Sequence, residues 1–219
     1  MKRKICEKIF IALTILLLAA CAPSTSLTNV RKNDMFKDRS IESIMVLGVA
    51  KHDDVRQHFE DLFVDAFQKK GITAVPAYKI MPENRKLTKE NIMDHKEIIK
   101  ETAANNHLGA VLFTHLVRMG EEQKDLDGQK WDAGPKRSYR DMGSYSIYVY
   151  RDVGSPGPPS RSVKRQFVRL NANIYDTASE KLMWSASSES IDETSTDTIF
   201  NELIKAVMGQ LKKDKLIGR

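Results

Sequence analysis

Cys21 is the residue whose type and position indicate a definite chemistry. It closes the run Leu18-Ala19-Ala20-Cys21, which ends an apolar segment that begins at Ile9 and follows four basic residues. This segment is too short for a membrane helix, which needs roughly 20 apolar residues. A basic start, a short apolar stretch and small residues before a cleavage point are typical of a secretory signal peptide. We therefore predict a signal peptide over residues 1–20.

The four residues that end at Cys21 resemble the lipobox of bacterial lipoproteins. In that family the cysteine thiol is diacylated, with palmitate among the usual acyl chains, and the chain is cut before the cysteine. The resemblance implies lipid attachment at Cys21, and two or more acyl chains suffice for stable anchoring. Ala22 follows rather than aspartate, which by the sorting rule of Gram-negative lipoproteins implies the outer membrane and a periplasm-facing domain. The alternative is an ordinary signal peptide whose cleavage region happens to hold a cysteine.

Histidine and carboxylate groups could bind a metal ion only if they converge in the fold. The five histidines show no pair at ligand spacing: His52, His58, His95, His107 and His115. Four carboxylates stand near a predicted helix start: Asp53, Asp54, Glu60 and Asp61. Carboxylates at such a position usually cap the helix and complement its dipole. We therefore predict no metal site and no cofactor.

The motifs of common catalytic and nucleotide-binding loops are absent from the sequence. The chain has no Gly-x-Gly-x-x-Gly motif, no phosphate-binding Gly-Lys-Ser/Thr loop and no Gly-x-Ser-x-Gly elbow. A catalytic triad can still assemble from distant residues, although no feature of the sequence points to one. We therefore expect a protein without enzymatic activity.

The net charge of the chain does not indicate a nucleic-acid partner. The formal charge of +6 falls by 3 to +3 without residues 1–20, because that segment holds four basic residues and one acidic residue. A small net charge without a basic stripe argues against nucleic-acid binding. Cys6 leaves with the signal peptide and Cys21 carries lipid, so we expect no disulfide.

The first half of the predicted domain alternates strands and helices. We predict a strand over 41–50, a helix from Asp53 or Asp54 to Gly71, a strand over 72–80, a helix from Asp94 to about Asn106 and a strand over 109–117. The first strand is a continuous apolar run typical of a central position. Pro76 either places the second strand at a sheet edge or truncates it. The order predicts right-handed parallel crossovers.

The second half is predicted to be a polar insertion, a hairpin and a closing helix. We predict an insertion over 119–162 with a β-prone segment at 145–150, strands over 163–175 and 182–187, and a helix from Ser195 or Thr196 to Lys213. The first hairpin strand alternates apolar and polar residues. Its polar side, with Arg169, Asn171, Asn173 and Tyr175, is therefore predicted to face water.

Together these elements predict a single α/β domain with a mixed sheet flanked by helices, over residues 41–215. Residues 21–40 show no sustained apolar period. We interpret them as the lipidated cysteine followed by a flexible tether.

The aromatic residues of the insertion form the candidate partner surface, because aromatic side chains beside a long loop suit protein recognition. They are Trp131, Tyr139, Tyr145, Tyr148 and Tyr150. One alternative is that the alternating aromatics simply pack across a sheet edge. Another is that residues 145–152 and 162–175 form a long membrane-inserted hairpin of an oligomer.

The order of elements and three segments resemble the secreted lipoproteins whose domain is similar to the amino-terminal domain of the Tol-system translocation protein. The segments are Ile44-Met45-Val46-Leu47, Leu108-Gly109-Ala110-Val111-Leu112, and residues 173–177 continuing to 181–185. This group includes the curli secretion lipoprotein and the lipoprotein activators of penicillin-binding proteins. The resemblance implies a non-enzymatic module that binds an envelope protein or serves assembly or activation. The alternative is an oligomeric secretion component of the curli type, although the chain lacks two clear membrane hairpins.

Overall fold

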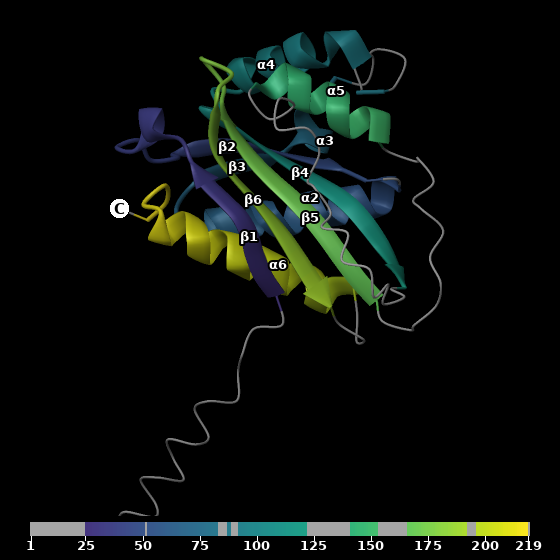
Figure 1. Ribbon diagram of the computed structural model, residues 1–219. Coiled ribbons are helices and arrows are strands. Elements are labelled where there is room, and N and C mark those ends of the chain that lie inside the picture. Colours follow the sequence, from purple (N-terminus) through teal and green to yellow (C-terminus); the bar gives the residue numbers. More distant parts are fainter. Residues whose placement is uncertain are drawn as a thin grey trace, which may run out of the picture.

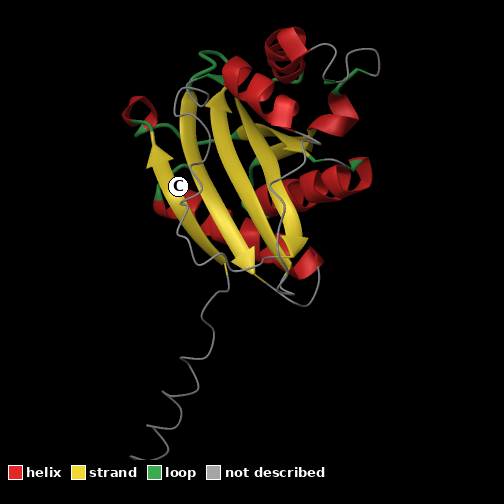
Figure 2. Cartoon of the chain, turned by 45° about the vertical axis from the view of Figure 1, so that its right-hand side comes forward, coloured by secondary structure: helices red, strands yellow, loops and turns green. Residues whose placement is uncertain are grey.

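The computed structural model describes residues 25–50, 52–82, 87–88, 92–121, 141–152, 166–191 and 196–218. These residues form one mixed sheet with helices on both faces (Figures 1 and 2). The strands are β1 (Thr25–Lys32), β2 (Ser43–Val49), β3 (Thr73–Pro76), β4 (Ala110–Glu121), β5 (Gln166–Asp176) and β6 (Leu182–Ile191). The helices are α2 (Asp53–Gln68), α3 (Ala77–Ile80), α4 (His95–Asn105), α5 (Met142–Asp152) and α6 (Thr196–Lys213), with 3-10 turns η1 (Asp34–Phe36) and η3 (Ile92–Asp94). The predicted α/β fold is confirmed.

The strand order β1-β6-β5-β4-β2-β3 joins a parallel part to an antiparallel part. β2 pairs in parallel with β3 on one side and β4 on the other. β4, β5, β6 and β1 then pair antiparallel in that order. Residues Ile44–Leu47 of β2 are at most 2% exposed, so β2 is the central strand that its continuous apolar run predicts.

β3 is shorter than the strand predicted over 72–80. It ends at Pro76, which has no backbone N–H to donate, and Ala77–Ile80 form the single-turn helix α3. The backbone N–H of Tyr78 donates to Glu60 Oε2 at 3.1 Å instead of to a neighbouring strand. β3 does lie at the sheet edge, as the proline predicts.

β1 lies within the range that was predicted to be a flexible tether, so that prediction is wrong for residues 25–40. β1 pairs antiparallel with β6, and Phe36 in η1 is buried. The pairing shifts register between Thr28 and Arg31, and Asn29 between them has a positive φ of 53°. This bulge and the polar, exposed residues of an edge strand hide the alternation that would reveal a strand in the sequence.

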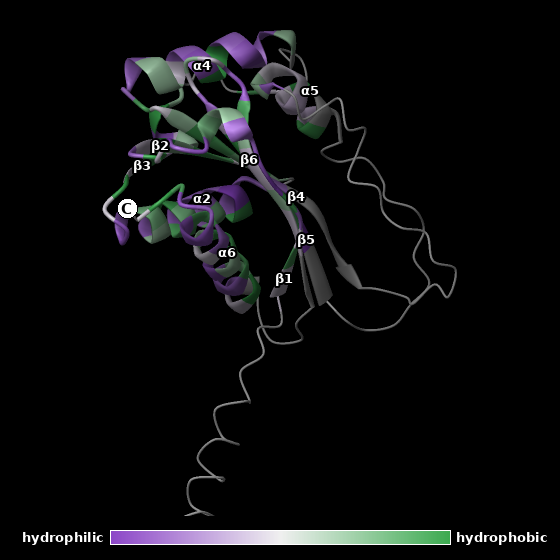
Figure 3. Ribbon diagram, turned by 60° about the vertical axis from the view of Figure 1, so that its left-hand side comes forward, coloured by the Kyte–Doolittle hydropathy of each residue, from purple (hydrophilic) through white to green (hydrophobic). Residues whose placement is uncertain are grey.

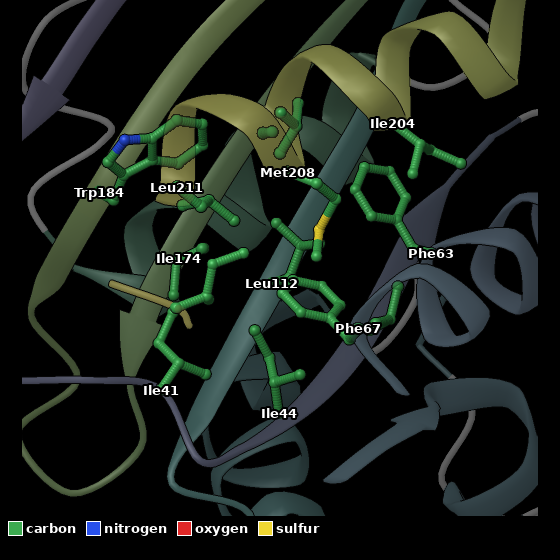
Figure 4. Close-up of a cluster of buried hydrophobic side chains, with 14 of the residues drawn as sticks. Ile41, Ile44, Phe63, Phe67, Leu112, Ile174, Trp184, Ile204, Met208 and Leu211 are labelled. Atoms are coloured by element: carbon green, nitrogen blue, oxygen red, sulfur yellow. The ribbon is translucent and has the colours of Figure 1, made fainter. Parts of the chain in front are cut away.

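One face of the sheet packs against α2 and α6 and holds the larger hydrophobic core (Figure 4). Phe63 and Phe67 of α2 meet Ile44 and Leu112 of the sheet, and all four are fully buried. Burying each of these side chains contributes about 2 kcal/mol. Trp184 of β6 lies at the other end of this core and donates from Nε1 to Asp214 Oδ2 at 2.8 Å, which fixes the end of α6 to the sheet.

The other face packs against α4 and α5, which Figure 3 shows on the opposite side of the sheet from α2 and α6. α5 covers the segment 145–150, whose residues are β-prone in the sequence, so that local preference does not decide the structure of this segment. Met142, Tyr145 and Val149 are fully buried and recur at helical spacing. Because their burial against the sheet outweighs the β propensity of the aromatic residues, this segment is a helix. The long membrane-inserted hairpin is therefore wrong, since its first arm is helical.

Asn171, Asn173 and Tyr175 of β5 are not open to water, contrary to the prediction, whereas Arg169 on the same side is partly exposed. Asn171 and Asn173 are 7% and 2% exposed, and Tyr175 is fully buried between Phe113 and Tyr145. α5 packs over this part of the sheet, and Asn171 accepts a hydrogen bond from the Ser187 hydroxyl at 2.9 Å. No helix among the described residues is long and apolar enough to cross a membrane.

Candidate functional site

The structure describes the side chains of two residues of the predicted partner surface, Tyr145 and Tyr150. Tyr145 is fully buried in the second core, with its ring 5.5 Å from that of Phe113, so its side chain does not reach a surface. Tyr150 ends the buried side of α5 and is half-buried. Tyr148 belongs to α5, but its side chain lies outside the described part of the structure, as do Cys21, Trp131 and Tyr139.

A charged cluster lies at the carboxyl end of β2, where α2 begins. The Glu60 carboxylate is completely buried and accepts hydrogen bonds from Gly48 N at 2.9 Å, Arg56 Nη1 at 3.1 Å and Tyr78 N at 3.1 Å. Arg56 also binds Asp53 at 3.1 Å. One carboxylate therefore ties α2 to the end of β2 and to the start of α3.

Electrostatics in this cluster follow from burial. Burial raises the pKa of Glu60, and the hydrogen bonds from Gly48, Tyr78 and Arg56 offset only part of that effect. Burial works against the charge of Arg56, but the attraction of Glu60 and Asp53 outweighs it and raises its pKa. Burial also raises the pKa of the nearby Tyr150 phenol. The cavity beside Gly48 and Arg56 is about 10 Å³, room for about one water molecule, so the cluster positions elements rather than binding a substrate.

Three of the residues considered as metal ligands, Asp61, His58 and His95, have other partners. Asp61 accepts from the Tyr78 hydroxyl at 2.9 Å and pairs with Lys79 at 3.3 Å. His58 lies 2.9 Å from Asp197. His95 is buried, and its Nε2 lies 2.8 Å from the Thr88 carbonyl oxygen. Within the described ranges, no three His, Cys, Asp or Glu residues gather as a metal ion would require.

A polar recess of about 370 Å³ lies at the opposite end of the sheet, where β2 and β4 begin. Arg39, which lines it, is neutralised by an ion pair with the buried Asp176 at 2.5 Å. Asp176 also accepts from the Ser179 backbone N–H at 2.8 Å. Arg39 is therefore paired within the domain, and the acidic residues Asp38 and Glu42 line the recess beside it.

An apolar groove of about 440 Å³ runs between α2 and α6 on the outer side of the first core. Its floor is apolar, with Leu62 and Ala66 from α2 and Ile204 and Met208 from α6. Four lysines and one aspartate carry the charge of its lining: Lys69, Lys70, Lys205, Lys212 and Asp65. We call these residues, with Asn201 and Gly209, the α2–α6 groove.

Sequence reasoning missed this groove. Lys69-Lys70 and Lys212-Lys213 stand where the two predicted helices end, a position at which lysine complements the helix dipole. The available signal was that both helices end with lysines and carry strong apolar stripes. Only the tertiary fold shows that α2 and α6 run side by side, with His58 of one helix bonded to Asp197 of the other.

Comparison with known proteins gives loose structural similarities only. No protein-family model matches the chain, and no curated protein matches it in sequence. The PelC dodecamer of Paraburkholderia phytofirmans is similar with a TM-score of 0.47 and 10% identity, over 89% of this chain and 99% of that chain. A single-residue variant of the same PelC is similar with a TM-score of 0.45 and 12% identity, over 84% of this chain and 94% of that chain. Lipoprotein GNA1162 from Neisseria meningitidis is similar with a TM-score of 0.38 and 17% identity, over 78% of this chain and 98% of that chain. At these identities and TM-scores the similarities assign no function to this chain.

Proposed function

We propose that this chain is a lipid-anchored envelope lipoprotein that acts by binding another envelope protein, without catalysing a reaction. One observation supports it above all: the lipobox cysteine is followed after only three residues by a strand of the central sheet. Cys21 precedes Ala22, Pro23 and Ser24, and β1 begins at Thr25. Lipid attached to Cys21 would therefore hold the folded domain directly, rather than through a long tether.

The covalent geometry limits how far the domain stands from its anchor. Four residue steps separate Cys21 from Thr25, and a fully extended chain spans at most roughly 14 Å over four steps. Thr25 pairs with Ser190 near the end of β6. The end of β4 and the start of β5 lie at the same end of the sheet, where Glu121 pairs with Gln166. This end, at the bottom of Figure 1, would face the outer membrane from the periplasmic side.

A non-catalytic role agrees with the charged groups of the described residues. The cluster of Arg56 with Glu60 is satisfied internally, and the cavity beside it has room for only about one water molecule. The α2–α6 groove is instead apolar and flanked by lysines, a surface that suits a protein partner better than a reaction. The insertion residues Trp131 and Tyr139 remain part of the proposal as a second contact region.

Crosslinking in intact envelopes tests this function. Wild-type protein and Cys21→Ser would be crosslinked in their own cells, and each covalent adduct would be identified by mass spectrometry. We expect one specific envelope protein in the wild-type adducts, and its loss or sharp decrease with Cys21→Ser. Adducts made only of copies of this chain would contradict the proposal and favour the oligomeric secretion component instead.

A further inference from the structure

The lysines of the α2–α6 groove lack carboxylate partners among the described residues. Ion pairs are present elsewhere on this domain, as for Lys96 and Lys100 with Glu180 at 2.9 and 2.7 Å. Lys69, Lys70, Lys205 and Lys212 are all exposed and form no such pair within the described ranges. The groove therefore presents a concentrated positive charge around an apolar floor.

Complementing the helix dipoles does not account for all of these lysines. Lys69, Lys70 and Lys212 lie at the ends of α2 and α6, where such an effect operates. Lys205 lies midway along α6, beyond the last turn to which the dipole effect is confined. Lys205 lines the groove between α2 and α6. A role in binding at the groove accounts for this position, whereas the helix dipole does not.

The shape of the groove matches a third helix. Its lining on α6 extends from Asn201 to Lys212, which is roughly 16 Å or three helical turns. A Cβ built on Gly209 would meet no atom within 4 Å, so a partner backbone can approach α6 closely there. Ala66 on the facing helix is small as well. An amphipathic helix fits because its apolar stripe meets the floor while its flanking side chains reach the rim.

We propose that the α2–α6 groove binds an acidic amphipathic helix of another protein. The inference deepens the proposed function, on which it rests, by naming the chemical class of the partner. Glutamate or aspartate beside the apolar stripe would meet the four rim lysines, and charge complementarity selects such a helix over a neutral or basic one.

The position of the groove favours a protein over the anchoring membrane. β1 begins at the anchored end, and Lys32 at its other end donates to the Asp214 carbonyl oxygen at 2.6 Å, just beyond the end of α6. The groove therefore extends along α6 away from the end that carries the lipid. Lys69, Lys70 and Lys212 lie toward its distant end, where a protein partner has access and the anchoring bilayer does not.

A binding titration with a defined probe tests the groove. The probe is a fluorescent amphipathic peptide of about 18 residues, five helical turns, with leucines on one stripe and glutamates beside them. A matched peptide carries lysine in place of every glutamate. Both are titrated against the full acylated protein in detergent by fluorescence anisotropy. We expect binding of the glutamate peptide alone, and weaker binding as salt screens the lysines.

Two pairs of variants locate the binding. Lys69→Gln with Lys205→Gln should weaken binding about fivefold, at roughly half a kcal/mol per rim contact. The matched control, Lys37→Gln with Lys181→Gln, changes two exposed lysines outside the groove and should leave affinity unchanged. Gly209→Glu places a carboxylate in the groove without steric conflict, and should weaken binding at least about tenfold more than Gly209→Gln.

Several outcomes would overturn the proposal. Equal binding of both peptides, or no difference between groove and control lysines, shows that the groove does not select acidic helices. Self-association that Gly209→Glu abolishes identifies a second copy as the occupant. Binding to vesicles of phosphatidylethanolamine and phosphatidylglycerol that the lysine variants weaken, without peptide binding, identifies a membrane. Repeating the titration with Cys21→Ser separates the two proposals, because groove binding should survive when anchoring is lost.

Discussion

The Thr25 hydroxyl donates a hydrogen bond to Glu202 Oε2 at 3.3 Å, across 177 residues of sequence. Thr25 begins β1 and stands four positions after Cys21, and Glu202 lies in the second turn of α6. Thr25, the first residue after Cys21 that the structure describes, is thus bonded both to β6 and to α6. A lipid on Cys21 would therefore hold the sheet and its helical layer together at the membrane.

The short connection predicts which end of the domain approaches the bilayer. A fluorophore placed by Asp197→Cys, at the start of α6, should be quenched strongly by lipids that carry a quencher. The same fluorophore at Lys213→Cys, roughly 24 Å farther along the helix, should be quenched much less. Time-resolved fluorescence in vesicles provides the measurement. Inserting a glycine-serine spacer after Ser24 should reduce quenching at position 197, and equal quenching at both positions would contradict the orientation.

Substitution by alanine should change the stability of the domain in opposite directions at Gly48 of β2 and Gly209 of α6. A Cβ on Gly48 would lie 3.2 Å from Cγ of both Arg56 and Glu60, so Gly48→Ala should destabilise the domain by about 1–3 kcal/mol. Gly209 is in a helix with open space around it, so Gly209→Ala should stabilise by about 0.5–1 kcal/mol. Urea denaturation of both variants is the check, and an unchanged or increased stability of Gly48→Ala would refute the packing described at Gly48.

Removing the buried carboxylate of Glu60 should lower the free energy of unfolding more than most single substitutions do. Glu60→Ala leaves the N–H groups of Gly48 and Tyr78 and the Arg56 guanidinium without their acceptor. We expect a loss of about 3 kcal/mol in the free energy of unfolding. Glu97→Ala, at an exposed position of α4, should change it by less than about 0.5 kcal/mol. Similar losses for the two variants in chemical denaturation would show that Glu60 does not hold α2 and α3 in place.

His95 should make the stability of the domain depend on pH. Burial lowers its pKa below the ordinary 6.5, although the hydrogen bond to Thr88 opposes this. The unfolded chain therefore takes up a proton at higher pH than the folded chain, so the contribution is complete above pH 6.5 and is lost as pH falls below it. His95→Gln, which can still donate to Thr88, should lose less stability than wild type between pH 7.5 and pH 5. Parallel pH profiles of unfolding free energy for the two proteins would be inconsistent with a neutral, buried His95.

The sequence predicts those elements whose burial leaves a regular pattern. β2 is buried on both faces and shows a continuous apolar run, while α2 and α6 show apolar stripes at helical spacing. The β5–β6 hairpin was likewise predictable from alternation and its turn residues. These elements include both helices of the groove, but the sequence did not predict that the two helices lie side by side.

The incorrect predictions for β1 and α5 have a common physical origin, because tertiary contacts decide both structures. β1 is a polar edge strand whose pairing partner, β6, lies about 160 residues later, so no local pattern marks it. In α5, Tyr145 and Val149 have high β propensity, yet burial against Phe113 and Tyr175 selects a helix. Such long-range burial also moved Tyr145 from the predicted partner surface into the core.

Metabolic labelling with a fatty-acid analogue, combined with membrane fractionation, tests the central claim most directly. The wild-type protein should incorporate the label and remain in the outer-membrane fraction after a high-salt wash, since two or more acyl chains anchor stably. Cys21→Ser should incorporate no label and leave the membrane. A labelled, membrane-bound Cys21→Ser protein would show that Cys21 is not the anchor and would remove the basis for the proposed orientation.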